Sequence, residues 1–207
     1  MMSNRVIYSI RTVRYGLNLY SSKLKCFFST RLMKLNFIFW GIRLKGQQSF
    51  FGKTYLRFHP SSKVKIGMNC TFRSSFFSNT IGLKQKCYIS AGKNAQLFIG
   101  NDCAFSGTVI NADKSIIIGN RVFCGANVTI CDSDRHPLDA KLRVLNHKGE
   151  IGAVRIENDV WLGMNVVVMK GVKIGKGTVI AANSVVVKDI PCNVVAGGIP
   201  AVVLKEI

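Results

Sequence analysis

The sequence predicts an all-β solenoid that follows an N-terminal helical segment. Two patterns support this prediction. In the second half of the chain, aliphatic residues recur every six positions without a slip, at Ile156, Leu162, Val168, Ile174, Ile180 and Val186. In the first 45 residues, apolar residues instead step alternately by four and three, which is the spacing of one face of a helix.

The helical segment is expected within residues 1–45. Its apolar face runs over about seven turns and comprises Val6, Ile10, Val13, Leu17, Tyr20, Leu24 and Phe27. Arginines and lysines lie off this face, so the helix would be basic and amphipathic. Such a helix suits an anionic membrane interface. It suits equally a cap over the exposed sheet edge at the end of a solenoid, and the two alternatives stay open at this point.

The six-residue period fits neither a helix nor a long flat strand, but it fits a short strand closed by a tight turn. A glycine follows several of the aliphatic residues, as in Ile118-Gly119 and Ile174-Gly175, where the chain would turn. Three such units close a triangular coil, and stacked coils bury a column of Ile, Leu and Val. Upstream the spacing is looser, which we interpret as short loops at the corners, and the first coil is expected between Gly46 and Ile66.

The repeat breaks once more, between Ile130 and Ile156, where residues 131–152 are polar and charged. A long insertion in an otherwise economical solenoid is usually functional, because a loop can carry chemistry while the coils supply rigidity. The predicted organisation is therefore a basic amphipathic segment at 1–45, a solenoid at 46–190 with the loop 131–152, and a C-terminal tail at 191–207.

The charge of the chain is concentrated in its first half. The 207 residues carry a net charge of +19, yet residues 1–101 hold 17 Lys and Arg and no acid, whereas residues 102–207 hold 12 basic and 10 acidic residues. An anionic surface or ligand is thus an expected partner. Nucleic acid is not, since no binding motif accompanies the charge.

The compartment expected from the sequence is the cytoplasm. The seven cysteines are odd in number and widely spread, which is typical of reduced core thiols. The longest apolar run of the N-terminal part, residues 35–42, is too short for a bilayer that needs about 20 residues. No secretory signal is expected, because arginines interrupt the apolar positions at the N-terminus.

The repeat, the segment DVWLGMNVVVMKGVKIGKGTVIAANSVVVKDIPCNVVAGGIPAVVLKEI at 159–207 and the motif DSDRHP at 132–137 resemble the hexapeptide-repeat acyltransferase family. The resemblance is to the branch that contains galactoside, maltose and capsule or O-antigen O-acetyltransferases, and it covers about residues 46–207. It implies a left-handed parallel β-helix, acetyl-CoA as co-substrate, and a homotrimer with active sites in the clefts between subunits.

Within this resemblance, His136 of the DSDRHP motif is the expected catalytic base, since an imidazole suits removal of a proton from a hydroxyl or amine. Asp134 or Asp132 is the candidate for orienting the imidazole; the alternative is that these acids are solvated or cap a turn. Asp113 matches an acid that binds sugar hydroxyls in the galactoside relatives, with closure of a turn as its alternative. No metal site is expected, because His59, His136 and His147 fall on separate segments without ligand spacing.

The resemblance also implies the residues that would contact coenzyme A. Trp161, Gly163 and Met164 would lie near the pantetheine arm, Ala182 further along, and Lys188 with Lys205 near the phosphates. The alternatives are that Trp161 packs under the loop and that the lysines are ordinary solvated residues. Two positions depart from the family pattern, because Val187 stands where Thr is common and Val202 where Arg or Lys is common.

The function expected from all this is acetyl-CoA-dependent O-acetylation of a sugar in a bacterial surface polysaccharide or its precursor, with His136 as general base. The acceptor would be a sugar, a nucleotide-sugar or a glycan. N-acetylation of an amino-sugar nucleotide is the alternative within enzymes. A solenoid that only binds membrane or nucleic acid is the alternative outside them. The expected location is the cytoplasm, with peripheral contact to the inner face of the cell membrane left open.

Overall fold

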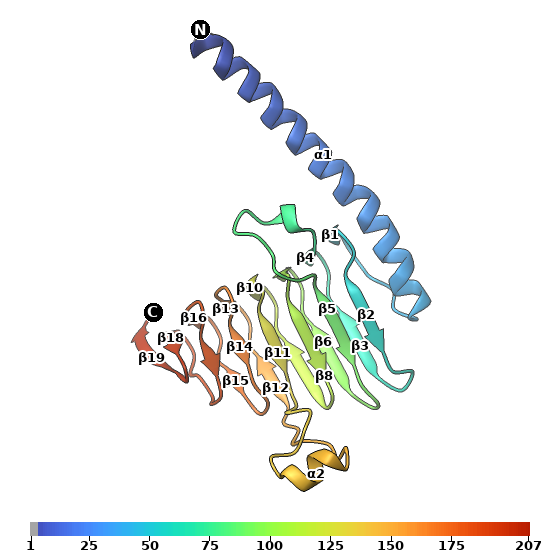
Figure 1. Ribbon diagram of the computed structural model, residues 1–207, viewed down its shortest axis with the longest axis vertical. Helices are drawn as coiled ribbons and strands as arrows, with labels where there is room; N and C mark the ends of the chain where they lie inside the picture. The colour runs from blue at the N-terminus through green and yellow to red at the C-terminus, as the bar shows by residue number, and fades with distance from the viewer. Residues whose placement is uncertain (1–3) are drawn as a thin grey trace.

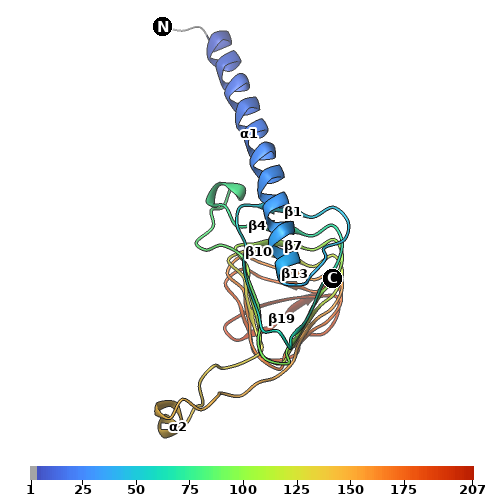
Figure 2. The same cartoon turned by 90° about the vertical axis from the view of Figure 1, so that its right-hand side faces the viewer.

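A long helix precedes three parallel sheets that wind into a triangular solenoid in the computed structural model, which describes residues 4–207 (Figure 1). The chain visits the sheets in turn, so from β1 to β17 each strand pairs with the strand three positions away rather than with its neighbour in sequence. We name them sheets A, B and C. Viewed along the solenoid, they form the three sides of a triangle (Figure 2).

The strands are short, as a six-residue period requires. Sheet A contains β1 (Ser49–Phe51), β4 (Thr71–Arg73), β7 (Ala104–Ser106), β10 (Phe123–Ala126), β13 (Trp161–Leu162), β16 (Val179–Ile180), β18 (Val194–Gly198) and β19 (Ala201–Glu206). Sheet B contains β2 (Tyr55–Phe58), β5 (Tyr88–Ala91), β8 (Val109–Ala112), β11 (Thr129–Cys131), β14 (Val167–Val168) and β17 (Val185–Val186). Sheet C contains β3 (Lys63–Ile66), β6 (Gln96–Ile99), β9 (Ser115–Ile118), β12 (Val154–Ile156) and β15 (Lys173–Ile174).

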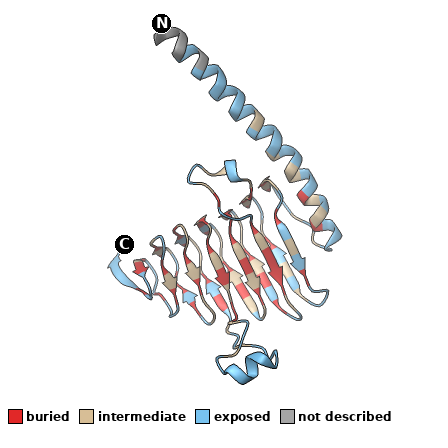
Figure 3. Ribbon diagram, in the orientation of Figure 1, coloured by how far each residue is buried: buried red, intermediate tan, exposed pale blue. Residues whose placement is uncertain are grey.

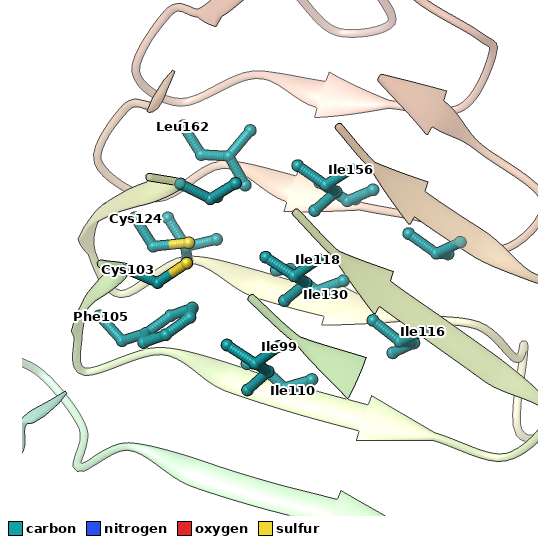
Figure 4. Packing of buried hydrophobic residues seen from close by; sticks show 14 of the residues in the cluster. Ile99, Cys103, Phe105, Ile110, Ile116, Ile118, Cys124, Ile130, Ile156 and Leu162 are labelled. Atoms are coloured by element: carbon teal, nitrogen blue, oxygen red, sulfur yellow. The ribbon is translucent and has the colours of Figure 1, made fainter. Parts of the chain in front are cut away.

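The predicted aliphatic column is confirmed. All six residues that set the period from Ile156 to Val186 are buried, and Ile99, Ile118 and Ile156 stack in register on successive strands of sheet C (Figure 4). Towards the N-terminal end the column widens to stacked rings, with the Phe72 centroid 4.8 Å from that of Phe50 and 5.1 Å from that of Phe105. The larger side chains fill the end of the solenoid that the helix covers.

Helix α1 (Asn4–Phe39) ends where Gly41 takes a left-handed conformation with φ of 72°. The Gly41 and Ile42 amides donate to the carbonyls of Ile38 and Phe37, an αL helix stop of the kind glycine permits. Near this end Met33 and Phe37 are buried, and the Phe37 ring packs on Phe50 and Phe58. The capping alternative is therefore confirmed for the C-terminal part of α1.

The rest of α1 projects away from the solenoid and is exposed (Figures 1 and 3). At about 100° per residue, the predicted apolar face lies opposite the pair that caps the solenoid. Leu17 and Leu24 remain 64% and 46% exposed, and the same face continues towards Leu35, which is 56% exposed. The cap therefore uses a different face of the helix and leaves the predicted one uncovered. Among residues 4–207, no helix has an apolar stretch long enough to cross a bilayer.

Three segments depart from a plain succession of coils. Residues 74–87 form a loop between sheets A and B that contains the short helix η1 (Phe76–Ser78), in agreement with the predicted corner loops. Residues 132–153 leave the corner between sheets B and C and carry helix α2 (Ala140–Val144). Residues 191–207, predicted to be a tail, instead extend sheet A, because β18 pairs with β16 and β19 folds back on β18. The buried side chain of Ala196 makes this hairpin part of the solenoid.

Candidate active site

The loop that carries His136 is anchored by a short antiparallel ladder at its base. Ser133 bridges to Ile151, the Asp134 amide donates to the Glu150 carbonyl at 3.0 Å, and the Gly152 amide donates to the Asp132 carbonyl at 2.9 Å. His136 follows this ladder and is exposed. A Cβ at Gly149 would lie 2.5 Å from the His136 carbonyl oxygen, so only glycine lets the two arms of the loop approach this closely.

Asp132 caps a turn. Its buried carboxylate accepts backbone N–H groups from Asp113 at 2.7 Å, Lys114 at 2.8 Å and Ser115 at 2.7 Å. Both carboxylate oxygens are thereby engaged by the neighbouring coil. Asp132 therefore acts as a turn cap, which was the alternative, and its role in orienting the imidazole stays a prediction.

Asp134 pairs with a lysine instead of the histidine. The Lys170 ammonium lies 2.8 Å from the Asp134 carboxylate and 3.3 Å from that of Glu150. The hydrogen bond to Asp134, and then that to Glu150, raises the pKa of Lys170 above its ordinary value. Asp134 meets His136 only through the backbone, where its carbonyl accepts the His136 amide at 2.7 Å. A cation within hydrogen-bond distance thus holds the Asp134 carboxylate, and the orienting role of Asp134 stays a prediction.

Asp113 lies at the corner from which the loop leaves, one coil before it. Its carboxylate accepts the Ser133 hydroxyl at 2.6 Å and lies 3.6 Å from the Arg135 guanidinium. Asp113 therefore ties the base of the loop to the solenoid. Its predicted role towards a sugar hydroxyl stays a prediction, and the structure places the residue beside the loop, as that role requires.

The residues predicted near the pantetheine arm gather on sheet A and its corner with sheet B. Trp161 begins β13 and is 54% exposed, so it does not pack under the loop. Gly163 and Ala182 lie on successive coils, and a Cβ on Gly163 would come within 2.6 Å of the Ala182 amide nitrogen. Only glycine fits at position 163, because the next coil stacks too closely to leave room for a side chain. Met164 accepts the Asn183 amide through its carbonyl, so it belongs to the same corner.

The two lysines predicted near the phosphates are both exposed but lie apart in the triangle. Lys188 follows β17 of sheet B, at the corner that faces sheet C. Lys205 lies on β19 of sheet A, opposite Val195. Their roles towards phosphate stay predictions.

The predicted site residues thus form two groups on different parts of one chain. His136, Asp134, Asp113 and Lys188 lie at the corner between sheets B and C, whereas Trp161, Gly163, Met164, Ala182 and Lys205 lie along sheet A. Figure 2 shows the loop with α2 at one vertex of the triangle and β13 on the opposite side. A site that uses both groups would need two chains.

Three residues that hold the loop were missed from the sequence. Lys170 binds two acids of the loop, Asp134 and Glu150, Arg135 approaches Asp113, and Gly149 allows the close approach of the His136 backbone. A glycine inside a polar insertion was a usable signal, since it marks a close backbone approach. Lys170 gave none, because it follows a strand like any solvated lysine.

Comparison with known proteins assigns the family. Residues 153–188 match the model for the bacterial transferase hexapeptide (six repeats). The galactoside O-acetyltransferase of Escherichia coli is 39% identical over 167 residues, 80% of this chain and 79% of that protein. Its counterpart from Lactococcus lactis is 41% identical over 143 residues, 69% of this chain and only 63% of that protein's length.

Among solved structures, a serine-to-alanine mutant of AntD, an N-acyltransferase from Bacillus cereus, in complex with dTDP-4-amino-4,6-dideoxyglucose and coenzyme A, superposes with a TM-score of 0.61. It is 15% identical, and the match covers 83% of this chain and 87% of that one, so the likeness concerns the fold. The hexapeptide repeat gives the left-handed sense of the β-helix. Its repeats, its loop and these relatives together establish that the chain belongs to the hexapeptide-repeat acyltransferase family.

Proposed function

We propose that this protein is an acetyl-CoA-dependent O-acetyltransferase that modifies a sugar of a surface polysaccharide or its precursor. The observation that carries the proposal is the position of His136, which is exposed on an anchored loop of a rigid solenoid. The E. coli and L. lactis relatives, both named galactoside O-acetyltransferases, support the acetyl group and the sugar hydroxyl.

In this mechanism the acetyl group passes directly from donor to acceptor. His136 takes the proton of the acceptor hydroxyl while the oxygen attacks the thioester carbonyl; the C–S bond then breaks, and the departing thiolate of coenzyme A takes up a proton. A backbone N–H in the cleft would stabilise the oxyanion. The thiol nearest the loop is a poor acyl carrier, because burial and then the neighbouring Asp132 raise the pKa of Cys131.

The test is release of coenzyme A thiol by the wild-type protein with a panel of sugar hydroxyl and amino-sugar acceptors. We expect thiol release that depends on a hydroxyl acceptor. If the protein binds no acetyl-CoA and releases no thiol with any acceptor, the proposal that it is an enzyme is refuted. The alternative of a solenoid that only binds membrane or nucleic acid is then favoured. Thiol release with amino sugars alone would instead favour the N-acetyltransferase alternative.

A homotrimer would bring the two groups of site residues together. The loop of one chain, with His136, would meet Trp161 and Gly163 on sheet A of the next chain, and each cleft would be completed by two subunits. This assignment rests on the separation of the two groups within one chain.

Mixed assemblies test it. His136→Ala and Trp161→Ala chains should each be nearly inactive alone, because each lacks a side chain from one half of every cleft, and both side chains are exposed. Co-expressed in equal amounts, they should regain about one quarter of the wild-type activity, since random closed assembly pairs an intact loop with an intact sheet A at that frequency. Activity that stays at the level of the single variants in correctly assembled mixtures would contradict the two-chain site.

We further propose that α1 contacts the inner face of the cell membrane. Leu17, Leu24 and their neighbours on the exposed face form an apolar stripe. The sequence of α1 contains no acid and seven basic residues, namely Arg5, Arg11, Arg14, Lys23, Lys25, Arg31 and Lys34. An anionic bilayer matches both features, whereas α1 of a second copy would add like charge.

A pair of matched double variants tests this contact. Leu17→Ser with Leu24→Ser removes two leucines from the stripe, which should weaken binding to phosphatidylglycerol vesicles by at least about 100-fold, given about 1.5–3 kcal/mol for each buried leucine. Tyr15→Ser with Leu19→Ser changes two exposed residues outside the stripe and should bind like wild type. Cosedimentation measures both. Equal losses in the two variants, or no binding by wild type, would refute the membrane contact.

A further inference from the structure

A groove leads from the end of α1 to the base of the catalytic loop. Its main hollow, of about 520 Å³, lies on sheet B and reaches from Trp40 to Asp113 and Arg135. A second hollow of about 190 Å³ shares Asp113 and Arg135 and continues between Lys93 and Lys148. Arg135 directly precedes His136, so the groove ends one residue along the chain from the proposed base, which itself lines neither hollow.

The groove is lined by cations. Arg57 points outward from β2 and lines the main hollow together with His59, at the end near α1. Among residues 4–207, Asp113 contributes the only carboxylate that lines the two hollows, and this carboxylate already accepts the Ser133 hydroxyl and faces the Arg135 guanidinium. The unmatched charge is therefore positive, and it favours an anionic ligand.

The floor of the groove suits a sugar. Tyr88 contributes an aromatic ring to the lining there, and the Asn111 amide lies two strands from Arg57, so about 10 Å separate these two backbones. Asn111 donates from Nδ2 to the Ser90 hydroxyl, but its Oδ1 is buried and has no hydrogen-bond partner among the described residues. A buried acceptor without a partner lacks a hydrogen bond that a ligand hydroxyl would supply.

We infer that the acceptor is a sugar that carries a phosphate. The sugar ring lies over Tyr88 and Asn111, with its reactive hydroxyl towards His136, and the phosphate lies towards Arg57. Guanidinium groups bind phosphate through charge-assisted hydrogen bonds, which a neutral glycoside cannot form. The inference rests on the proposed function. Both a nucleoside diphosphate sugar and a lipid-linked sugar contain this sugar–phosphate unit.

Direct binding tests the inference without relying on turnover. Calorimetry would compare hexose 1-phosphates with methyl glycosides of the same hexoses, for galactose, glucose, mannose and N-acetylglucosamine, on full-length protein. At least one 1-phosphate should bind about tenfold or more tightly than its methyl glycoside. Arg57→Gln should weaken that binding about 10- to 100-fold, the range for a hydrogen bond to a charged group, and leave binding of the methyl glycoside unchanged.

Lys176→Gln serves as the matched control, because Lys176 is an exposed cation outside the groove. It should bind the 1-phosphate like wild type. A nucleoside diphosphate hexose and a short-chain prenyl diphosphate hexose then distinguish the two sources by which binds more tightly. Equal affinity for all phosphate and methyl forms, or equal losses in the Arg57 and Lys176 variants, would overturn the inference. If the phosphate preference holds but no acetyl transfer occurs, the proposed function fails and the groove assignment survives.

Discussion

His136→Ala is expected to lower kcat by about 10²- to 10⁴-fold, the usual contribution of a positioned general base. Without the imidazole, the acceptor hydroxyl would have to attack the thioester while keeping its proton. The fold should be unaffected, because the His136 side chain is exposed and only its backbone packs against Gly149. Steady-state thiol release, with saturating acetyl-CoA, measures the change.

His147→Ala is the matched control, since it removes another exposed histidine from the same loop. Its kcat should remain within about twofold of wild type, because it plays no part in proton transfer. Full activity of the His136 variant would refute the assignment of the base. A comparable loss in both variants would show that the loop, rather than the His136 imidazole, is being perturbed.

Asp132→Ala is expected to destabilise the protein by about 3–5 kcal/mol. The variant removes the buried carboxylate that accepts the half-buried amides of Asp113 and Ser115 and the amide of the exposed Lys114, and each unsatisfied group costs about 1–3 kcal/mol. For a chain of this size, that loss lowers the Tm by about 10 °C. Thermal unfolding followed by circular dichroism measures the shift.

Asp189→Ala provides the comparison for Asp132. Asp189 is exposed and accepts one backbone amide, that of Lys173, at 2.7 Å. Its loss should cost about 1 kcal/mol or less. If the Asp132 variant keeps the wild-type Tm while its activity falls, Asp132 acts in catalysis and the turn-cap assignment is wrong.

The solenoid could be predicted because its buried core residues recur in the sequence every six positions. Each buried aliphatic from Ile156 to Val186 occupies the same place in its coil, so spacing alone gave strand length and turn position. The two strands at the end of the chain could not be predicted, because the six-residue spacing stops at Val186. Residues 191–207 nevertheless form β18 and β19, which extend sheet A by pairing that no local pattern reveals.

The N-terminal helix shows what periodicity leaves undecided. The stripe through Leu17 and Leu24 identified an amphipathic helix, yet the residues that cap the solenoid, Met33 and Phe37, lie on the other side. Apolar residues occur on both faces of α1, and the sequence alone does not reveal which face packs against the solenoid. The capping face is decided by the Phe50 and Phe58 rings, which the sequence does not place in space.

The part of the candidate site that a sequence motif marks could be predicted. The roles that depend on hydrogen-bond or ion-pair partners could not. His136 follows from its motif, and the structure places it on an anchored loop. The roles of Asp132 and Asp134 depend on their partners. The backbone amides of residues 113–115 bind the Asp132 carboxylate, and the Lys170 ammonium binds that of Asp134. These partners are distant in sequence, so two acids in one motif looked equivalent although one caps a buried turn and the other binds a lysine.

The most direct test of the central claim is the fate of a labelled acetyl group. Wild-type protein, acetyl-CoA labelled in the acetyl group and the preferred sugar acceptor are incubated, and the product is treated with hydroxylamine. We predict label on the sugar as a hydroxylamine-labile ester, formed in step with thiol release and with no label left on the protein. A hydroxylamine-stable amide on the sugar would contradict O-acetylation, and label retained on the protein would contradict direct transfer.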